Sequence, residues 1–118
     1  MNLRDVRRMA LALPESTEEP HFHLTSFRVR RKIFATAPPD SDYLHVFVDE
    51  AARNRYLAAE PDFLEPLTWG RKVVGLRVIL AAAKPRVVQT MLRDAWRAKA
   101  PKRLQQAAGI ATQSRGSK

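Results

Sequence analysis

The sequence has no cysteine and only four glycines among its 118 residues. Without cysteine, the chain can form no disulfide, no thiolate metal site and no cysteine nucleophile. It also has no apolar run near the ~18 residues that a membrane span needs, and its N-terminus lacks the apolar core of a signal peptide. These absences are typical of proteins in the reducing cytoplasm, where we expect this one to work.

Signatures of common enzyme classes are missing as well. The sequence has no phosphate-binding glycine loop, no His-Glu-x-x-His zinc motif and no Gly-x-Ser-x-Gly nucleophile elbow. Glu18 and Glu19 beside His21 and His23 could form an acid–base group, and these histidines could share a metal with His45, but no carboxylate stands at a matching position. We therefore expect no enzyme activity, no cofactor and no metal site.

Negative charge is scarce in the last third of the chain. The whole sequence has 21 basic and 12 acidic side chains, a net charge of +9. Residues 84–118 hold nine of the basic side chains and a single acidic one, Asp94, so this third alone carries +8. Such a segment attracts nucleic acid, anionic membrane or acidic protein without distinguishing among them.

Residues 26–36 combine strand-type and basic side chains and predict a β-hairpin that turns within Arg30–Lys32. Like charges gathered at its tip repel one another unless a polyanion neutralises them. The alternative is a solvated tip whose charges discourage pairing with other sheet edges. Four cations surround the turn: Arg28, Arg30, Arg31 and Lys32.

The spacing of apolar residues along the sequence predicts the remaining helices and strands. We expect three helices and a short additional one, at Asn2–Leu13, Glu50–Glu60, Pro85–Ala98 and Lys102–Ala108. We expect the sheet to open at His21–Leu24, ahead of the hairpin, and to continue with Tyr43–Val48, Leu67–Trp69 and Val73–Leu80.

Other stretches are expected to connect these elements. Glu15–Pro20 is acidic and polar and is expected to be a loop, Asp62–Glu65 is expected to be irregular, and Gly70–Lys72 is typical of a turn. Trp69, Trp96 and the phenylalanines are the expected source of the core, because large aromatic side chains bury the most surface.

The order is therefore helix, three strands, helix, two strands, helix. Short loops between consecutive strands favour antiparallel pairing. The sequence predicts a two-layer α+β domain over residues 1–108, with an antiparallel sheet of about five strands and helices on one face. Residues 109–118 are expected to form a flexible polar tail.

Short motifs in this order resemble the MmcQ/YjbR family. The resemblance implies a compact α+β unit, likened to secretion chaperones and to a double-wing DNA-binding motif. Relatives commonly carry glycine where this chain has Arg31, so the turn here either differs in type or tolerates strain. The motifs are Leu11-Ala12-Leu13-Pro14, Phe27-Arg28-Val29, Lys32-Ile33-Phe34-Ala35, Trp69-Gly70, Asp94-Ala95-Trp96 and Ala100-Pro101-Lys102.

Two functions are compatible with these patterns. The first is a non-enzymatic DNA-binding protein with little sequence preference, because basic side chains contact phosphates and no recognition helix is visible. The second is a chaperone-like interaction module that binds an acidic protein. The oligomeric state and any DNA target stay open. The candidate nucleic-acid contacts are Arg28, Arg30, Arg31, Lys32, Arg71, Lys72, Lys102 and Arg103.

Overall fold

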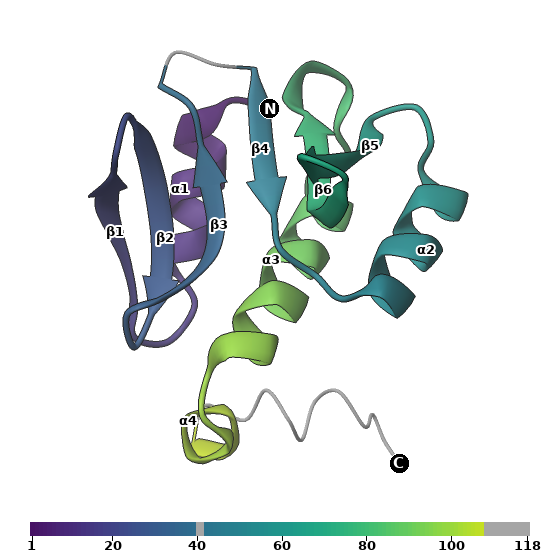
Figure 1. Cartoon of the computed structure of the whole chain (residues 1–118). Helices are drawn as coiled ribbons and strands as arrows, with labels where there is room; N and C mark the ends of the chain where they lie inside the picture. The colour runs from purple at the N-terminus through teal and green to yellow at the C-terminus, as the bar shows by residue number, and fades with distance from the viewer. Residues whose placement is uncertain (40–41, 108–118) are drawn as a thin grey trace.

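The computed structural model of the chain describes residues 1–39 and 42–107. Its six-stranded antiparallel sheet has the order β1-β2-β3-β4-β6-β5 (Figure 1). The α+β prediction is confirmed, with six strands in place of about five, whereas the predicted tail lies outside the described residues. The strands are β1 Ser16–His21, β2 Leu24–Val29, β3 Lys32–Ala37, β4 Tyr43–Val46, β5 Leu64–Trp69 and β6 Lys72–Ile79.

The helices occupy the predicted places. Asn2 caps α1 in a capping box with Asp5, and Asp49 caps α2 by accepting a hydrogen bond from the Ala52 amide. In the described part of the chain, no helix is both long and apolar enough to cross a bilayer. The helices are α1 Leu3–Leu11, α2 Glu50–Ala59, α3 Pro85–Lys99 and α4 Lys102–Ala107, with a 3₁₀ turn at Leu80–Ala82.

The additional strand is β1, which corrects the prediction that Glu15–Pro20 is a loop. β1 pairs antiparallel with β2 along its whole length, from Ser16 opposite Val29 to His21 opposite Leu24. In a sequence, a proline such as Pro20 argues against a strand, because it has no amide N–H to donate to a neighbouring strand. It is tolerated here because β1 is an edge strand. The expected first strand segment, His21–Leu24, instead spans the turn: His21 ends β1, Phe22 and His23 form the turn, and Leu24 begins β2.

The opposite edge gives a second correction of the same kind. Asp62–Glu65 was expected to be irregular, but β5 begins at Leu64 and continues through Pro66 to Trp69. Of the described strands, β5 pairs with β6 alone, so Pro66 also stands on an edge strand. Both edges of the sheet therefore carry a proline, which hinders the addition of a further strand.

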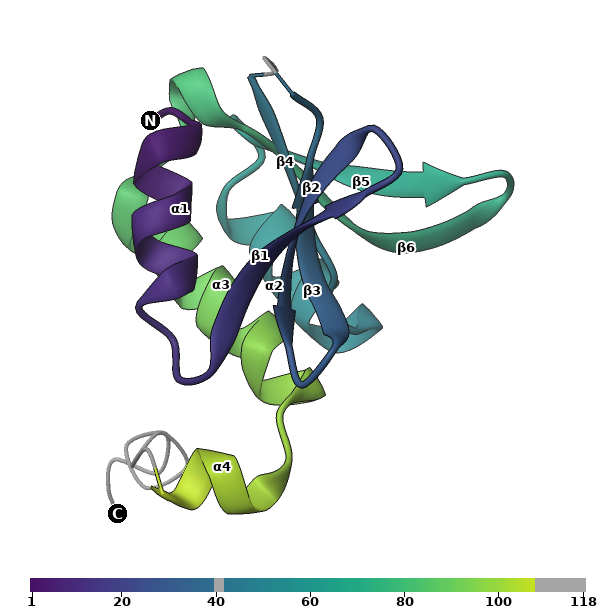
Figure 2. The same cartoon turned by 90° about the vertical axis from the view of Figure 1, so that its left-hand side faces the viewer.

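The core lies between one face of the sheet and the helices. Helices α1 and α3 pack on that face, and the Tyr56 hydroxyl on α2 donates a hydrogen bond to Asp94 on α3 at 2.6 Å (Figure 2). Trp96 is fully buried, as predicted. The other face of the sheet is left uncovered by α1 and α3, and we call it the open face. Other large buried side chains are Phe27, Phe34, Phe63, Leu44 and Leu76.

Two aromatic residues that were assigned to the core are on the surface instead. Phe22 is 89% exposed and Trp69 is 58% exposed. Phe22 lies in the β1–β2 turn, and Trp69 ends β5 beside the β5–β6 turn. The prediction that the tryptophans and phenylalanines supply the core is therefore wrong for Phe22 and Trp69, and Phe47 is only partly buried.

Candidate functional site

The β2–β3 turn falls on Arg30 and Arg31, as predicted. Both residues have positive φ, 51° and 72°, the backbone pattern of a type I′ turn. This turn matches the twist of the strands but favours glycine and asparagine, and a left-handed residue with a side chain costs about 1–2 kcal/mol. The chain therefore keeps a glycine-type turn and accepts strain to place arginine there.

The four cations around this turn are not equivalent. Arg30 forms an ion pair with Glu15, and its hydrogen bonds lower the pKa of the Glu15 carboxyl below the usual value. Arg28 lies along the sheet, where it donates hydrogen bonds to Ser26 Oγ at 2.9 Å and to the Pro20 carbonyl at 3.2 Å. Among the described residues, Arg31 and Lys32 are therefore the two hairpin cations that neither form an ion pair nor are held along the sheet by side-chain hydrogen bonds.

The remaining predicted cations fall in two places. Lys102 and Arg103 are exposed on α4, at the same end of the molecule as the β2–β3 turn in both Figure 1 and Figure 2. The β5–β6 turn, with Arg71 and Lys72, projects separately (Figure 2). None of these four forms an ion pair within residues 1–39 and 42–107. We call the exposed cations at the shared end the basic end: Arg31, Lys32, Lys102 and Arg103.

A row of polar residues crosses the open face. The strand register places Ser26, Thr36, His45, Arg77 and Glu65 opposite one another on five neighbouring strands. Ser26 Oγ donates to the Glu19 carbonyl at 2.7 Å, Thr36 Oγ1 lies 3.4 Å from His45 Nδ1, and Arg77 donates twice to Glu65 Oε1. The row satisfies its own hydrogen bonds and stabilises the sheet.

The histidines do not gather into a metal site. His21 and His23 border the β1–β2 turn and His45 lies within β4. In the described ranges, no three His, Asp or Glu side chains come close enough together to hold a metal ion. Burial, and then the positive charge of Arg77, lowers the pKa of His45 below its usual 6.5. This half-buried imidazole is therefore neutral at neutral pH.

The acidic members of the imagined acid–base group are already engaged. Glu18 accepts a bidentate pair of hydrogen bonds from Arg7, at 2.6 and 2.9 Å. Glu19 accepts one from the Thr17 hydroxyl at 2.9 Å. Glu18 therefore holds β1 beside α1, and Glu19 forms its hydrogen bond within β1. Neither carboxylate has a hydrogen bond to a histidine among the described residues.

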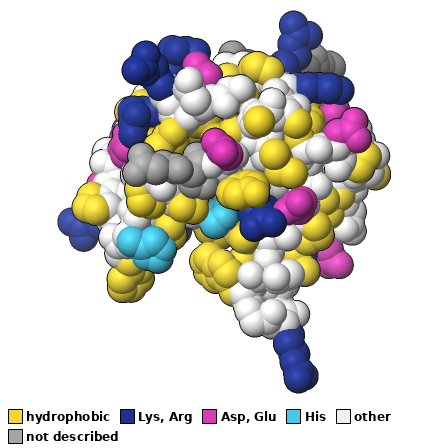
Figure 3. Space-filling model, turned by 90° about the horizontal axis from the view of Figure 1, so that it is seen from above, with side chains coloured by type: hydrophobic (Ala, Val, Ile, Leu, Met, Phe, Trp, Pro, Cys, Tyr) yellow, Lys and Arg dark blue, Asp and Glu magenta, His cyan; other side chains and the backbone are white. Residues whose placement is uncertain are grey.

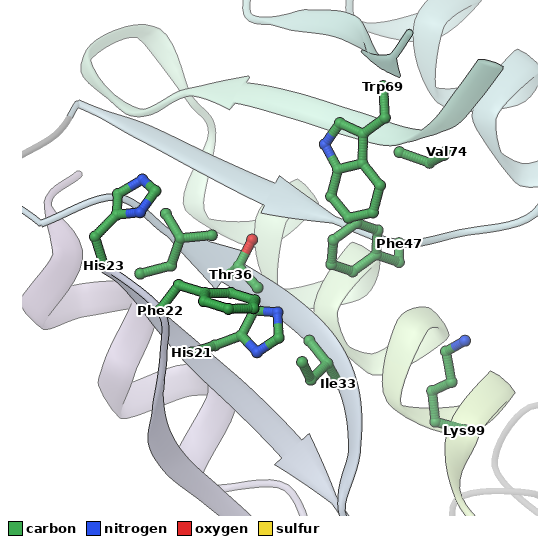
Figure 4. A pocket seen from close by; sticks show the side chains of 10 residues that line it. His21, Phe22, His23, Ile33, Thr36, Phe47, Trp69, Val74 and Lys99 are labelled. Atoms are coloured by element: carbon green, nitrogen blue, oxygen red, sulfur yellow. The ribbon is translucent and has the colours of Figure 1, made fainter. Parts of the chain in front are cut away.

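An apolar cleft of about 910 Å³ lies on the open face, between the β1–β2 turn and the β5–β6 hairpin. Figure 3 shows the surface hollowed between two projections, with hydrophobic and histidine side chains along the gap. In Figure 4, Phe22 and His21 stand on one side, and Trp69 stands edge-on to Phe47 on the other, with 5.6 Å between ring centroids. Its apolar lining is Phe22, Leu24, Ile33, Phe47, Trp69 and Val74.

The polar residues of the apolar cleft are neutral or basic. His21, His23, Thr36 and Lys99 complete its lining, and no Asp or Glu of residues 1–39 and 42–107 contributes to it. Lys72 pairs with Trp69 across the β5–β6 ladder, and directly paired residues project from the same face of a sheet. This cleft was not predicted from the sequence; the available signal was an aromatic residue in or next to a hairpin turn, Phe22 in the β1–β2 turn and Trp69 before the β5–β6 turn.

Comparison with known proteins gives the family and the fold. The YjbR family model matches residues 11–98, from the end of α1 to the end of α3. The crystal structure of Deinococcus radiodurans protein DR2400, described as a DUF419 domain, aligns with a TM-score of 0.73 over 92% of this chain and 88% of that chain. At 20% identity, this likeness establishes the fold alone. No curated protein matches the sequence.

Proposed function

This chain belongs to the YjbR family, and we propose that it is a non-enzymatic DNA-binding protein that contacts phosphates with little sequence preference. The observation that carries the proposal is the basic end, where four exposed cations stand without an ion pair among the described residues. Cations held together in this way are stabilised by a polyanion, whose condensed counterions are released when it binds.

The strained turn supports the same function. Arg31 occupies a position where glycine would cost less, so the chain accepts a less favourable backbone to hold a cation at the tip. Strain that packing does not require is often retained at functional positions. The tip faces solvent, and Arg31 and Lys32 can reach neighbouring phosphates of one strand.

The projecting β5–β6 turn would act as the second wing of a double-wing protein. Arg71 and Lys72 are exposed there and could contact phosphates some distance from the basic end. The contacts on both wings are arginine and lysine contacts to the backbone, which fix position without reading bases. DNA binding and the absence of cysteine both fit a cytoplasmic protein.

The proposal is tested by titrating the full-length protein with two unrelated duplexes of about 20 base pairs at low salt. We expect binding to both, with affinities that agree within about threefold, because phosphate contacts carry no sequence information. Failure to bind either duplex would remove DNA as the partner. A preference of more than about 100-fold for one duplex would show base readout and contradict the proposed contacts.

A further inference from the structure

The apolar cleft exposes large aromatic side chains to water, which costs free energy unless a partner covers them. Phe22 is 89% exposed, and Trp69 is 58% exposed on the other side of the gap. Large contiguous apolar patches on soluble proteins generally mark interaction sites. The cleft thus has the surface of a binding site, and no segment among the described residues fills it.

The backbone conformation of Phe22 also supports a binding role for the cleft. The β1–β2 turn consists of Phe22 and His23, and only Phe22 has a positive φ, 57°. That pattern is typical of a type II′ turn, whose first central position favours glycine. The chain therefore places a large aromatic side chain where a glycine would be less strained, and projects it at the mouth of the cleft.

The charged residues around the cleft indicate which kind of partner it can bind. The cleft is lined by Lys99 and flanked by Lys72, and none of the described residues that line it is an Asp or Glu. An occupant with apolar groups and negative charge would complement it, whereas a cationic one would be repelled.

The shape and lining favour a protein segment. The hollow is open between the two projections (Figure 3), so a small molecule would stay largely in water, whereas a chain can enter and leave. The aliphatic walls at Leu24, Ile33 and Val74 offer few partners to the polar edges of nucleic-acid bases. The prolines on both edge strands hinder binding by strand addition, so the occupant must sit on the open face.

We propose that the apolar cleft binds a protein segment that carries apolar side chains flanked by acidic residues. Phe22 and Trp69 pack on its apolar side chains from opposite sides, while Lys72 and Lys99 neutralise its carboxylates. Lys72 is shared with the proposed DNA contacts of the β5–β6 turn, but the cleft includes no residue of the basic end. Peptide binding can therefore be tested separately from DNA binding at the basic end.

The probe is a synthetic peptide of roughly 12 residues in which leucine and phenylalanine alternate with glutamate. Trp69 reports on the cleft by fluorescence, since the other tryptophan, Trp96, is fully buried. We expect a saturable change with a dissociation constant on the order of 10 μM. The same peptide with lysine in place of glutamate, or serine in place of its apolar residues, should bind at least about tenfold more weakly.

Variants then locate the site. Phe22→Ser should weaken peptide binding by about tenfold, whereas Leu11→Ser, which removes an apolar side chain exposed on α1, should change it less than about twofold. Phe22→Gly should also lose binding while raising the unfolding midpoint, because glycine relieves the positive φ. Trp69→Phe should abolish the fluorescence change, and calorimetry should still detect binding.

Several results would overturn the proposal. Equal binding of the glutamate and lysine peptides would show that charge does not select the occupant. Unchanged binding by Phe22→Ser would place the peptide elsewhere. A larger Trp69 signal with single-stranded oligothymidylate than with the glutamate peptide would assign the cleft to nucleic acid instead of protein.

Discussion

Arg30, at the tip of the β2–β3 turn, is paired with Glu15, the residue that precedes β1. This ion pair joins two segments that meet only because β1 lies beside β2. It neutralises one tip cation and leaves Arg31 and Lys32 as the tip cations without an ion pair among the described residues. The net charge at the hairpin tip therefore depends on the position of β1, which brings Glu15 to Arg30, as well as on the turn residues themselves.

Glu15→Gln should strengthen DNA binding. It releases Arg30 for a further phosphate contact, so the slope of log affinity against log salt should steepen by about one. The unfolding midpoint should hardly change, because both partners of the pair are exposed. Asp62→Asn is the matched control: it removes one exposed negative charge away from the turn and should leave the slope as in the wild type.

Arg31→Gly should stabilise the fold while weakening DNA binding. Glycine accepts the φ of 72° without strain, and the gain, after its larger entropy cost, is about 0.5–1 kcal/mol in the free energy of unfolding. Arg31→Ala removes the same charge but retains a Cβ, so its stability should match the wild type. Chemical denaturation separates the two variants; equal stabilities would show that the turn is not strained.

Trp96 ties α3 to the loop between α1 and β1. Its indole N–H donates a hydrogen bond to the Pro14 carbonyl at 3.0 Å, and the ring is fully buried. Trp96→Ala should lower the free energy of unfolding by about 3–5 kcal/mol. Trp96→Phe retains most of the packing and should lose about 1–2 kcal/mol, chiefly for the unsatisfied carbonyl. An unchanged denaturation midpoint for Trp96→Ala would contradict this placement.

Stability should fall at mildly acidic pH because of His45. Its folded pKa lies below the usual 6.5, owing to burial and then to Arg77. The unfolded chain therefore binds a proton first as the pH falls, and stability decreases from about pH 6.5 down to the folded pKa. His45→Gln should flatten the pH dependence of the unfolding midpoint between about pH 7.5 and 5.5. Parallel curves for the two proteins would count against this role.

Much of the fold could be predicted from the sequence, because local patterns determine it. Asn2 and Asp49 mark helix starts, and the apolar stripe around Trp96 identifies α3. The two missed strand segments contain Pro20 and Pro66, which break a sequence pattern but fit an edge strand. Whether a strand lies at an edge depends on the order of the whole sheet, which no local pattern contains.

The sites were harder to predict because they depend on contacts distant in sequence. The eight cations remain predicted nucleic-acid contacts, and the pairing of Arg30 with Glu15 requires β1, which was expected to be a loop. Phe22 and Trp69 lie on different hairpins and face one cleft only through the strand order. Large aromatic residues are usually buried, so the sequence alone favoured the core for both.

The measurement that tests the DNA-binding proposal most directly is the salt dependence of duplex binding for two double variants. Arg31→Ala with Lys32→Ala removes two cations of the basic end, and Arg4→Ala with Arg86→Ala removes two exposed cations on α1 and α3. Each lost phosphate contact should flatten the slope by about 0.9, so the first variant should lose about two and the control close to none. Equal slopes for both variants and the wild type would contradict the account.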